Sequence, residues 1–471
     1  MKFFRKAVIL GAVLVIAGGA YWFFEIKKKK EKAEVEKKEA MLVEQSDIPI
    51  VKLSLAPKGG EPIILERIEK EVDDLEETGG GEEIEEPHEW NILSPVETGG
   101  DKYSIGSVIR SIKDSRREDV IYENLDKMEE YGLGDPGFLI TFFYEGDETE
   151  HGIAFGVKSL DGKKIFARVL GKDKIFSIPV DLLGTLNRSL FDMRDKRIAG
   201  FDPADVVSVS LVSMIEAFML EKENDEWYFQ PEGIKASKAR VEMYAGSLSW
   251  GSFVSVEEEK GEDFIRYGLN APRVMVNFKL EDDSNFMFVV GDMIEEGEAR
   301  FFYATRTSDD MIFQVQADLV SRLLKTKFEL KDRRIFDFTA DEVTEITLEK
   351  EDKSFHLVRE GKSWKFEGME EKLERDYRID NIVRGIAEAE YEQVDPVKRG
   401  SSEYDETGIE NIFYTAILFF DDEKSPVTVT MTERDEETNK IWLTPDNGET
   451  AYFTSGYFVS NFPETKEDYL E

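Results

Sequence analysis

The 471-residue sequence contains no cysteine and only three histidines. The absence of cysteine excludes disulfides, thiolate metal sites, a cysteine nucleophile and a lipidated N-terminal cysteine. Basic residues are also scarce, because 61 Lys and Arg stand against 100 Asp and Glu and give a formal net charge of -39. A surface this acidic repels phosphate backbones, so we expect no nucleic-acid partner.

Short motifs for catalysis and nucleotide binding are missing as well. The sequence has no Gly-x-x-x-x-Gly-Lys-Ser/Thr loop, no Gly-x-Gly-x-x-Gly after a strand and no Gly-x-Ser-x-Gly elbow. His88, His151 and His356 are isolated from one another, so we interpret each as a surface or hydrogen-bonded polar residue rather than a metal ligand. We therefore assign no catalytic, cofactor-binding or metal-binding residue, expect no cofactor, and predict that the protein is not an enzyme.

One long hydrophobic run is present near the N-terminus. After the basic lead "MKFFRK", residues 7–24 are 18 uncharged residues that end in the aromatic belt "YWFF". A bilayer core requires roughly 20 apolar residues in a helix. The run predicts a basic lead and single-pass transmembrane anchor over residues 1–26, then a charged helical stalk over residues 27–46. A cleaved signal peptide is the alternative, but the length of the run favours the anchor.

The charges around this run give conflicting indications of sidedness. The stretch "KKKKEK" (27–32) outweighs the basic lead, so the positive-inside rule places the bulk of the chain in the cytoplasm. The same stretch has the charge to contact anionic lipid, although a solvated stalk is the simpler interpretation.

An internal repeat organises the rest of the chain. Trp90, Trp227 and Trp364 follow one another at intervals of 137 residues, and "FMLEKENDEW" matches "FHLVREGKSW" at the same offset. Self-similarity at a fixed period indicates repeated folding units. We predict three modules: 47–199 with an acidic loop insertion, 200–336, and 337–471.

Each module is expected to hold one helix and several strands. Apolar residues at i, i+3, i+4 and i+7 follow each tryptophan, which predicts a helix with one buried stripe. Runs rich in aromatic and β-branched residues, such as "FLITFFYEG" and "RVMVNFKLE", predict strands. The expected fold class is α+β: an N-terminal transmembrane helix followed by three tandem α+β modules with mainly antiparallel sheets. The predicted helix stripes are Ile105, Val108, Ile109, Ile112; Val241, Tyr244, Ala245, Leu248; and Ile379, Ile382, Val383, Ile386.

The first module carries an insertion. Leu65 and Trp90 are separated by 18 more residues than the equivalent pairs of the other modules, and the added sequence is acidic and Gly-rich. We interpret it as an enlarged surface loop. A calcium site is the alternative, but no Asp-x-Asp-x-Asp-Gly spacing supports it.

A second phrase recurs in the middle of each module, as "YGL" at Tyr131 and Tyr267 and as the degenerate "TGI" at Thr407. Gly132 and Gly268 are each followed four residues later by a proline. This predicts a turn with a left-handed glycine, whose Tyr and Leu pack as a plug against the sheet. We expect a structural role for it rather than ligand contact.

Basic segments mark the two predicted module junctions, "RDKRI" and "KDRRI". Their arginines permit an anion site, but each segment contains an aspartate that can pair with its own arginines. We therefore predict a structural ion-pair clasp. The residues concerned are Arg194, Asp195, Arg197, Asp332, Arg333 and Arg334.

The blocks "EWYFQP", "RYGLNAP" and "LKDRRIFDF", together with the N-terminal segment, resemble the family catalogued as domain of unknown function four-three-four-zero over roughly the whole chain. No catalytic residues can be transferred, because none is assigned in that family. The resemblance implies a membrane-anchored bacterial protein that accompanies auxiliary components of ABC-type transport systems, with its bulk outside the cytoplasm. This is association rather than mechanism.

The expected function is that of a membrane-anchored, non-catalytic repeat protein. It would act as a scaffold or accessory subunit of an envelope or ABC-type transport-associated complex and bind other proteins there. The alternative is an extracytoplasmic carbohydrate- or peptide-binding protein that uses exposed aromatics such as Trp250 or Trp442.

Overall fold

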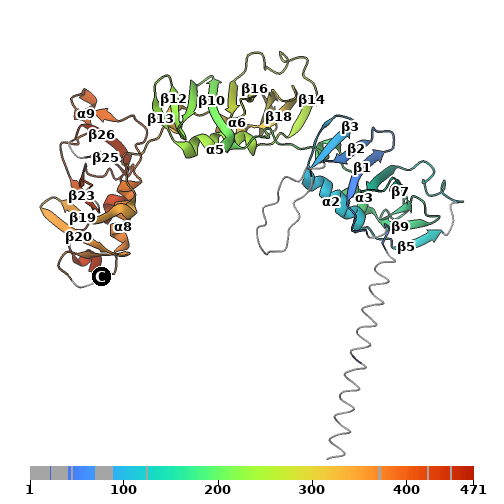
Figure 1. Ribbon diagram of the computed structural model, residues 1–471, viewed down its shortest axis with the longest axis horizontal. Helices are drawn as coiled ribbons and strands as arrows, with labels where there is room; N and C mark the ends of the chain where they lie inside the picture. The colour runs from blue at the N-terminus through green and yellow to red at the C-terminus, as the bar shows by residue number, and fades with distance from the viewer. Residues whose placement is uncertain are drawn as a thin grey trace, which may run out of the picture. The chain divides into compact units, whose positions relative to one another are not determined.

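The computed structural model describes residues 22, 41–43, 46–68, 89–122, 126–369, 373–421, 424–445 and 448–470. The described chain forms three antiparallel sheets with short helices between their strands (Figure 1). Strands make up 41% of the chain and helices 20%, so the protein is built mainly of antiparallel sheet.

This result corrects the fold class expected from the sequence. An N-terminal transmembrane helix was predicted as the first element, but no helix among the described residues is long and apolar enough to span a bilayer. Residues 1–26, which carry the predicted anchor, lie outside the described residues except for Trp22. The α+β content is confirmed, but helices are the minor component. Buried and partly exposed residues alternate along strands such as β12 and β23.

The first sheet has nine strands in the order β4-β3-β2-β1-β6-β7-β8-β9-β5. Strand β1 lies near the centre, as the fourth strand in this order, and pairs with both β2 and β6. It is called the central strand below, as are its counterparts β10 and β19. In chain order the strands are β1 (Ile50–Pro57), β2 (Ile63–Arg67), β3 (Trp90–Ser94), β4 (Thr98–Gly100), β5 (Asp119–Tyr122), β6 (Phe138–Tyr144), β7 (His151–Lys158), β8 (Lys164–Val169) and β9 (Ile175–Pro179).

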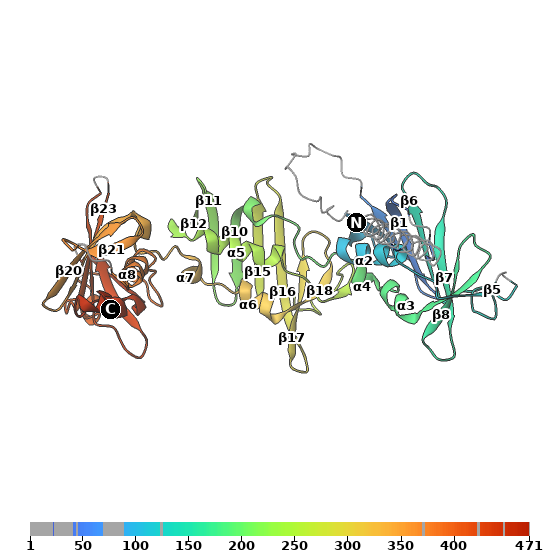
Figure 2. The same cartoon turned by 90° about the horizontal axis from the view of Figure 1, so that it is seen from below.

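The second sheet also has nine strands, in the order β13-β12-β11-β10-β15-β16-β17-β18-β14. Figure 2 shows several of these strands side by side. They are β10 (Val206–Ser213), β11 (Ala217–Glu223), β12 (Glu226–Gln230), β13 (Ile234–Ala236), β14 (Ser255–Glu258), β15 (Val274–Leu280), β16 (Asn285–Glu296), β17 (Ala299–Arg306) and β18 (Ile312–Gln316).

The third sheet has eight strands in the order β21-β20-β19-β23-β24-β25-β26-β22. Its order is the same as in the other two sheets except at the first edge. In the described part of the chain, no strand corresponds to the edge strands β4 and β13 of those sheets. Its strands are β19 (Val343–Lys350), β20 (Lys353–Glu360), β21 (Ser363–Phe366), β22 (Val397–Lys398), β23 (Tyr414–Phe420), β24 (Val427–Met431), β25 (Lys440–Pro445) and β26 (Thr450–Ser455).

The three sheets agree in register as well as in order. The pairing of the central strand with its long-range neighbour shifts at the same place in each sheet, after Ile50, Val206 and Val343. A shared irregularity at equivalent positions indicates copies of one folding unit. The three tryptophans also occupy equivalent strands, β3, β12 and β21, and each is at most 4% exposed. The predicted module boundaries themselves stay a prediction.

The helices form as the apolar spacing predicted. Residues at three- and four-residue intervals fall on one face of a helix, and the stripe residues are buried except for Ile109, which is partly buried. The helices are α2 (Lys102–Lys113), α3 (Val180–Leu186), α4 (Leu190–Met193), α5 (Lys238–Ser249), α6 (Ala317–Leu323), α7 (Lys327–Leu330), α8 (Tyr377–Ala387), α9 (Ser402–Glu406) and α10 (Glu467–Leu470), with 3₁₀ helices η1 (Pro203–Asp205), η2 (Ala340–Glu342) and η3 (Tyr457–Asn461).

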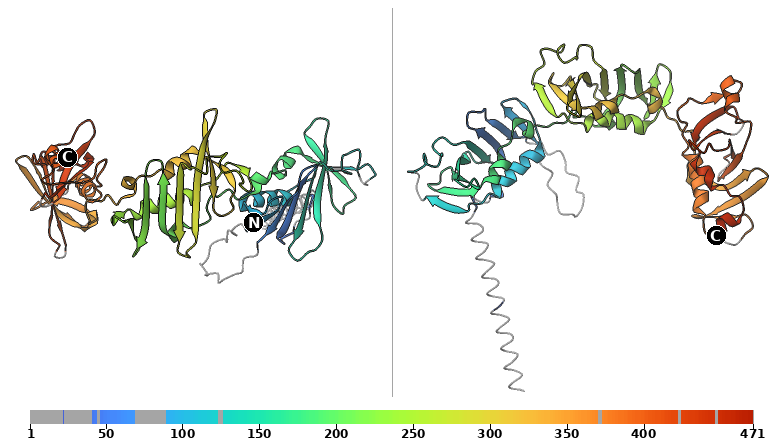
Figure 3. Two further views of the ribbon diagram at one scale, coloured as in Figure 1. Left: turned by 90° about the horizontal axis from the view of Figure 1, so that it is seen from above. Right: turned by 180° about the vertical axis from the view of Figure 1, so that it is seen from behind.

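The first and third sheets each bury a large core against one helix. In the first sheet Ile105, Val108 and Ile112 of α2 join strand residues such as Leu55 and Phe142. Helix α8 makes the same kind of core with the third sheet. Figure 3 shows α2, in cyan, lying along its sheet. Burial of these apolar faces is the main source of stability for each sheet.

The chain divides into two compact units. The first consists of Met1–Ala217 with Tyr244–Leu324, and the second of Phe218–Met243 with Lys325–Glu471. Each unit contains a short extended segment that is bridged on both sides. In the first unit Arg194 bridges to Gly100 and Arg197 to Ser252.

In the second unit Lys331 bridges to Ala236 and Arg334 to Glu390. A related bridge joins Met41 to Arg116, and the N–H of Leu42 donates to the carbonyl of Ser115. The described end of the predicted helical stalk (27–46) is therefore not helical but packs on the first sheet's module. Residues 69–88, which hold most of the predicted acidic insertion and His88, lie outside the described residues.

Candidate functional site

The recurring "YGL" turn has the backbone conformation that the sequence predicted. Gly132, Gly268 and Gly408 have φ angles of 66°, 68° and 69°, in the left-handed region that favours glycine. The turn is closed in the first two modules by the N–H of the following leucine, which donates to a carbonyl five residues back, as from Leu269 to Phe264 at 2.9 Å. This prediction is confirmed.

The tyrosines of the first two turns pack as the predicted plug. The rings of Tyr131 and Phe166 meet edge to face with centroids 4.7 Å apart, and Tyr267 meets Tyr303 at the same distance. The hydroxyl of Tyr267 donates to Glu258 at 2.9 Å. Burial, together with this bond, raises the pKa of Tyr267. The tyrosine and leucine of each turn belong to a small hydrophobic cluster that is separate from the main core of the sheet. The turns therefore have a structural role.

The predicted ion-pair clasps form at both junction segments. Arg197 binds Asp195 through Nη2 at 2.6 Å, and Arg334 binds Asp332 through Nη2 at 2.8 Å. The guanidinium of Arg334 holds the pKa of Asp332 below its ordinary value. Both aspartates are therefore engaged by their own arginines, and no anion-binding function is needed to explain the motif.

Arg194 and Arg333 behave differently, which the sequence did not reveal. Arg194 is only 2% exposed, and its guanidinium donates to Glu259 at 2.7 Å. Arg333 pairs with Glu390, which also binds Arg240 at 2.5 Å. Because these partners lie 57 to 150 residues away in the chain, local spacing contains no signal for them.

The two described histidines are hydrogen-bonded polar residues, as predicted. His151 lies at the start of β7 with Nε2 3.1 Å from Asp147, and this bond lowers the pKa of Asp147 to about 2. His356 contacts Thr347 through Nδ1 at 2.8 Å. In the described part of the chain, no group of three or more His, Asp or Glu side chains is arranged to hold a metal ion.

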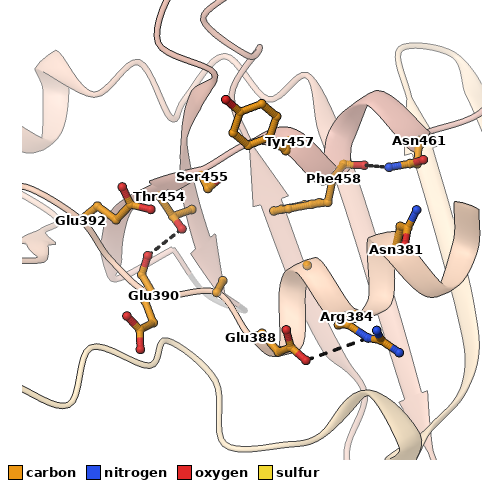
Figure 4. A pocket seen from close by; sticks show the side chains of 12 residues that line it. Asn381, Arg384, Glu388, Glu390, Glu392, Thr454, Ser455, Tyr457, Phe458 and Asn461 are labelled. Atoms are coloured by element: carbon orange, nitrogen blue, oxygen red, sulfur yellow. Dashed lines mark hydrogen bonds and ion pairs between the residues drawn. The ribbon is translucent and has the colours of Figure 1, made fainter. Parts of the chain in front are cut away.

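The third module contains a groove of about 550 Å³ between α8 and η3 (Figure 4). Gly385 makes the close packing of these helices possible, since a Cβ there would stand 2.5 Å from Cβ of Phe458. Arg384 and Glu388 on α8 form an exposed pair at 4.0 Å, and Thr454 donates to the carbonyl of Glu390. The carboxylates of Glu390 and Glu392 pair with basic residues outside the groove, so this groove suits polypeptide contact better than chemistry.

A second open pocket, of about 510 Å³, lies beside the degenerate turn of the third module. Three aromatic side chains line it: Phe413, Trp442 and Phe453. The ring centroids of Trp442 and Phe453 are 5.2 Å apart. Its rim is polar. The remaining lining residues are Thr407, Gly408, Asn411, Thr432, Glu433, Asp435, Thr438, Lys440 and Ile441.

Neither pocket holds an arrangement typical of an enzyme. No histidine is among the residues that line them. The hydroxyl of Thr438 donates to Oδ1 of Asp435 at 2.9 Å, but the same oxygen also accepts from the N–H groups of Glu437 and Thr438, as in a turn that a carboxylate caps. The carboxylate pKa values that are strongly lowered belong to exposed side chains bound by neighbouring residues, such as Asp147 and Glu342. Such shifts accompany surface ion pairs and do not define a catalytic group.

The fold and these sites define a class: a β-rich protein of repeated antiparallel sheets, with structural clasps and open grooves. The family model described as Domain of unknown function (DUF4340) matches residues 90–233 and again residues 227–410. The two matches begin at Trp90 and Trp227 and together cover more than half of the chain. The chain belongs to this family, as the sequence blocks indicated. Among curated proteins and among solved structures, no match was found.

Proposed function

We propose that the protein is a non-catalytic scaffold or accessory subunit that binds other proteins of an envelope or ABC-type transport-associated complex. The observation that carries this proposal is the repetition itself. Three sheets share one strand order, and a buried tryptophan and a left-handed glycine turn recur in each module. An Asp–Arg ion pair recurs at both junction segments. Repeated units of this kind offer extended binding surface.

Grooves on the third module support protein binding. The groove between α8 and η3 presents Tyr457, which is 63% exposed, beside buried Phe458 and charged Arg384. Aromatic side chains surrounded by a polar rim are enriched in protein–protein interfaces. The high negative charge favours basic partner surfaces and disfavours nucleic acid.

Photo-crosslinking in cells tests the scaffold. A crosslinking amino acid at Tyr457 should capture defined protein partners, and the same label at exposed Leu160, in the β7–β8 hairpin, serves as the matched control. Equal capture at both positions, or none at either, would contradict the proposal. Turnover of a substrate by the purified chain in broad activity profiling would replace it with an enzymatic function.

The cell membrane, with the described residues on the extracytoplasmic side, is the proposed location. The family resemblance supports it, whereas the lysine-rich stretch 27–32 argues for the opposite side. Protease digestion of intact and permeabilised cells decides between them. Cleavage in intact cells is expected, and protection until permeabilisation would place the chain in the cytoplasm.

A carbohydrate- or peptide-binding protein is the second candidate. It is favoured by the position of Trp442 in the open 510 Å³ pocket. Trp250, the other aromatic considered, is 74% exposed, follows helix α5 directly and lies against Gly246 of that helix. Binding on a ligand array that disappears in Trp442→Ala would favour this candidate.

A further inference from the structure

The strand registers identify one position that differs between the three modules. In the first sheet Phe138 pairs with Phe155, in the second Val274 pairs with Val290, and in the third Tyr414 pairs with Met431. These pairs are equivalent, because their first members occupy the same place opposite the central strand. The next residues along the chain are therefore equivalent too: Gly156, Gly291 and Thr432.

The two glycines allow the "YGL" turn to dock on the sheet. A Cβ at Gly156 would stand 1.9 Å from the carbonyl oxygen of Tyr131, and one at Gly291 would stand 2.1 Å from that of Tyr267. These carbonyls accept hydrogen bonds from the strand at 2.9 Å, from the N–H of Val157 and of Asp292. Any side chain at the glycine position would collide with the docked turn.

Thr432 places a side chain at this position in the third module. Its hydroxyl accepts from the N–H of Trp442 at 3.1 Å and donates to the carbonyl of Glu433 at 3.1 Å. Within the described residues, the N–H of Glu433 makes no bond to the carbonyl of Thr407 that would match those of the first two modules. The third turn therefore lacks this backbone hydrogen bond and meets the sheet through side chains instead, with Tyr404 and Ile409 in one cluster with Trp442.

The aromatic partner of the missing tyrosine remains in the third module. Ala167, Ala304 and Leu443 are equivalent in register, so the residues before them, Phe166, Tyr303 and Trp442, are equivalent as well. Phe166 and Tyr303 each contact a turn tyrosine, but the third turn has Thr407 in that place. The 510 Å³ pocket lies there, between the turn and Trp442.

We propose that this pocket binds an aromatic side chain, specifically a tyrosine carried on a turn of a partner protein. The occupied sites of the first two modules show what fits against the equivalent aromatic residue. Phe413, Trp442 and Phe453 supply apolar walls, and edge-to-face contact with a ring is favourable. Glu433 lines the pocket and can accept from a tyrosine hydroxyl, as Glu258 does from Tyr267.

The polar rim favours a tyrosine over a sugar ring. Oδ1 of Asp435 already accepts from the N–H groups of Glu437 and Thr438, and Lys440 is bound to Glu392. Few side chains are thus left to satisfy the many hydroxyls of a sugar. The proposal rests on the proposed function only in taking the partner to be a protein.

The test uses the chain's own turn as a probe. A capped peptide of residues 262–273, which contains Tyr267, is titrated into the full chain by calorimetry. We expect one site, with binding weakened roughly tenfold or more by Trp442→Ala, as for an aromatic anchor in a pocket. Trp250→Ala is the matched control and should leave binding unchanged. A peptide with Tyr267→Ala should not bind.

A second variant keeps the test independent of folding defects. Thr407→Tyr combined with Thr432→Gly restores the docked turn, so it should fill the pocket and abolish peptide binding while Trp442 remains. Equal binding to this variant, no binding at millimolar peptide, or competition by an oligosaccharide rather than by tyrosine amide overturns the proposal.

The same variants in cells separate the two proposals. If the crosslink at Tyr457 captures partners equally in the wild type and Trp442→Ala but the peptide fails to bind, the scaffold stands and the pocket assignment fails. If the peptide binds as expected but no partner is captured in cells, the pocket stands and the scaffold fails.

Discussion

The indole N–H of Trp364 donates a hydrogen bond of 2.8 Å to Oδ1 of Asp380, which joins strand β21 to helix α8. Trp364 is only 1% exposed, and the guanidinium of Arg359 lies 5.6 Å from its ring centroid. The periodic tryptophan of the third module is thus held by packing, by a hydrogen bond and by a cation over its ring.

We expect Trp364→Ala to lower the free energy of unfolding of the third sheet by about 3–5 kcal/mol, through loss of buried area and a residual cavity. Asp380→Ala should cost about 1 kcal/mol, and Asp380→Asn less, because the amide oxygen can still accept the bond. Hydrogen exchange of the amides of β20 and β21 measures these changes locally. Equal losses for Asp380→Ala and Asp380→Asn would show that the hydrogen bond contributes nothing.

The glycine turn gives a prediction with an internal comparison. Gly268→Ala should cost about 1 kcal/mol, because φ is 68°. Gly291→Ala should detach the turn, since its Cβ would meet a backbone carbonyl at 2.1 Å, whereas the nearest atoms to Gly268 belong to the exposed side chain of Asp292. The amide of Asp292 should lose its protection from exchange only in Gly291→Ala. Retained protection there would contradict the docking argument.

The junction segments predict unequal effects of two similar substitutions. Glu259→Leu leaves the buried Arg194 without its carboxylate and should destabilise the first unit by about 3 kcal/mol. Asp195→Asn breaks a pair with Arg197, which is 62% exposed, and should cost under about 1 kcal/mol. Chemical denaturation of the two variants compares them. A larger loss of unfolding free energy for Asp195→Asn would mean that the exposed Asp195–Arg197 pair stabilises the junction segment more than the buried Arg194 does.

Acid should break a contact at the start of the third sheet. The ammonium of Lys424 and the N–H of Thr339 hydrogen-bond Glu342 and lower its pKa from 4.5 to about 2. Ionised Glu342 therefore stabilises the fold above about pH 4.5, and this contribution is lost as the pH falls through about 2. Titration by NMR should show the low pKa, and Lys424→Met should raise it towards 4.5. An unchanged pKa in that variant would remove the ammonium as the main cause.

Sequence patterns predicted those parts of the fold that depend on nearby residues. The helix stripes, the left-handed glycines and the Asp–Arg pairs all involve groups within a few residues of one another, so spacing alone indicates them. The transmembrane helix expected as the first element is not among the described helices, and its residues, apart from Trp22, lie outside the described chain. Fold class was therefore the weaker part of the prediction, because its first element rested on one N-terminal hydrophobic run alone, whereas the predicted strand runs do form strands, such as β6 and β15.

By itself, the sequence determined that one unit recurs every 137 residues and which residues form its turns and helices, because these features repeat in the linear order. Only the tertiary structure decided that Arg194 is buried against Glu259 and that Thr432 replaces the glycine that lets a turn dock. The physical reason is that antiparallel pairing brings together residues far apart in the chain. In each module, the strand register decides which residue lies under the turn, and that residue decides whether the turn can dock and its tyrosine can reach the sheet. The register joins residues that are far apart in the chain, so it cannot be read from neighbouring residues.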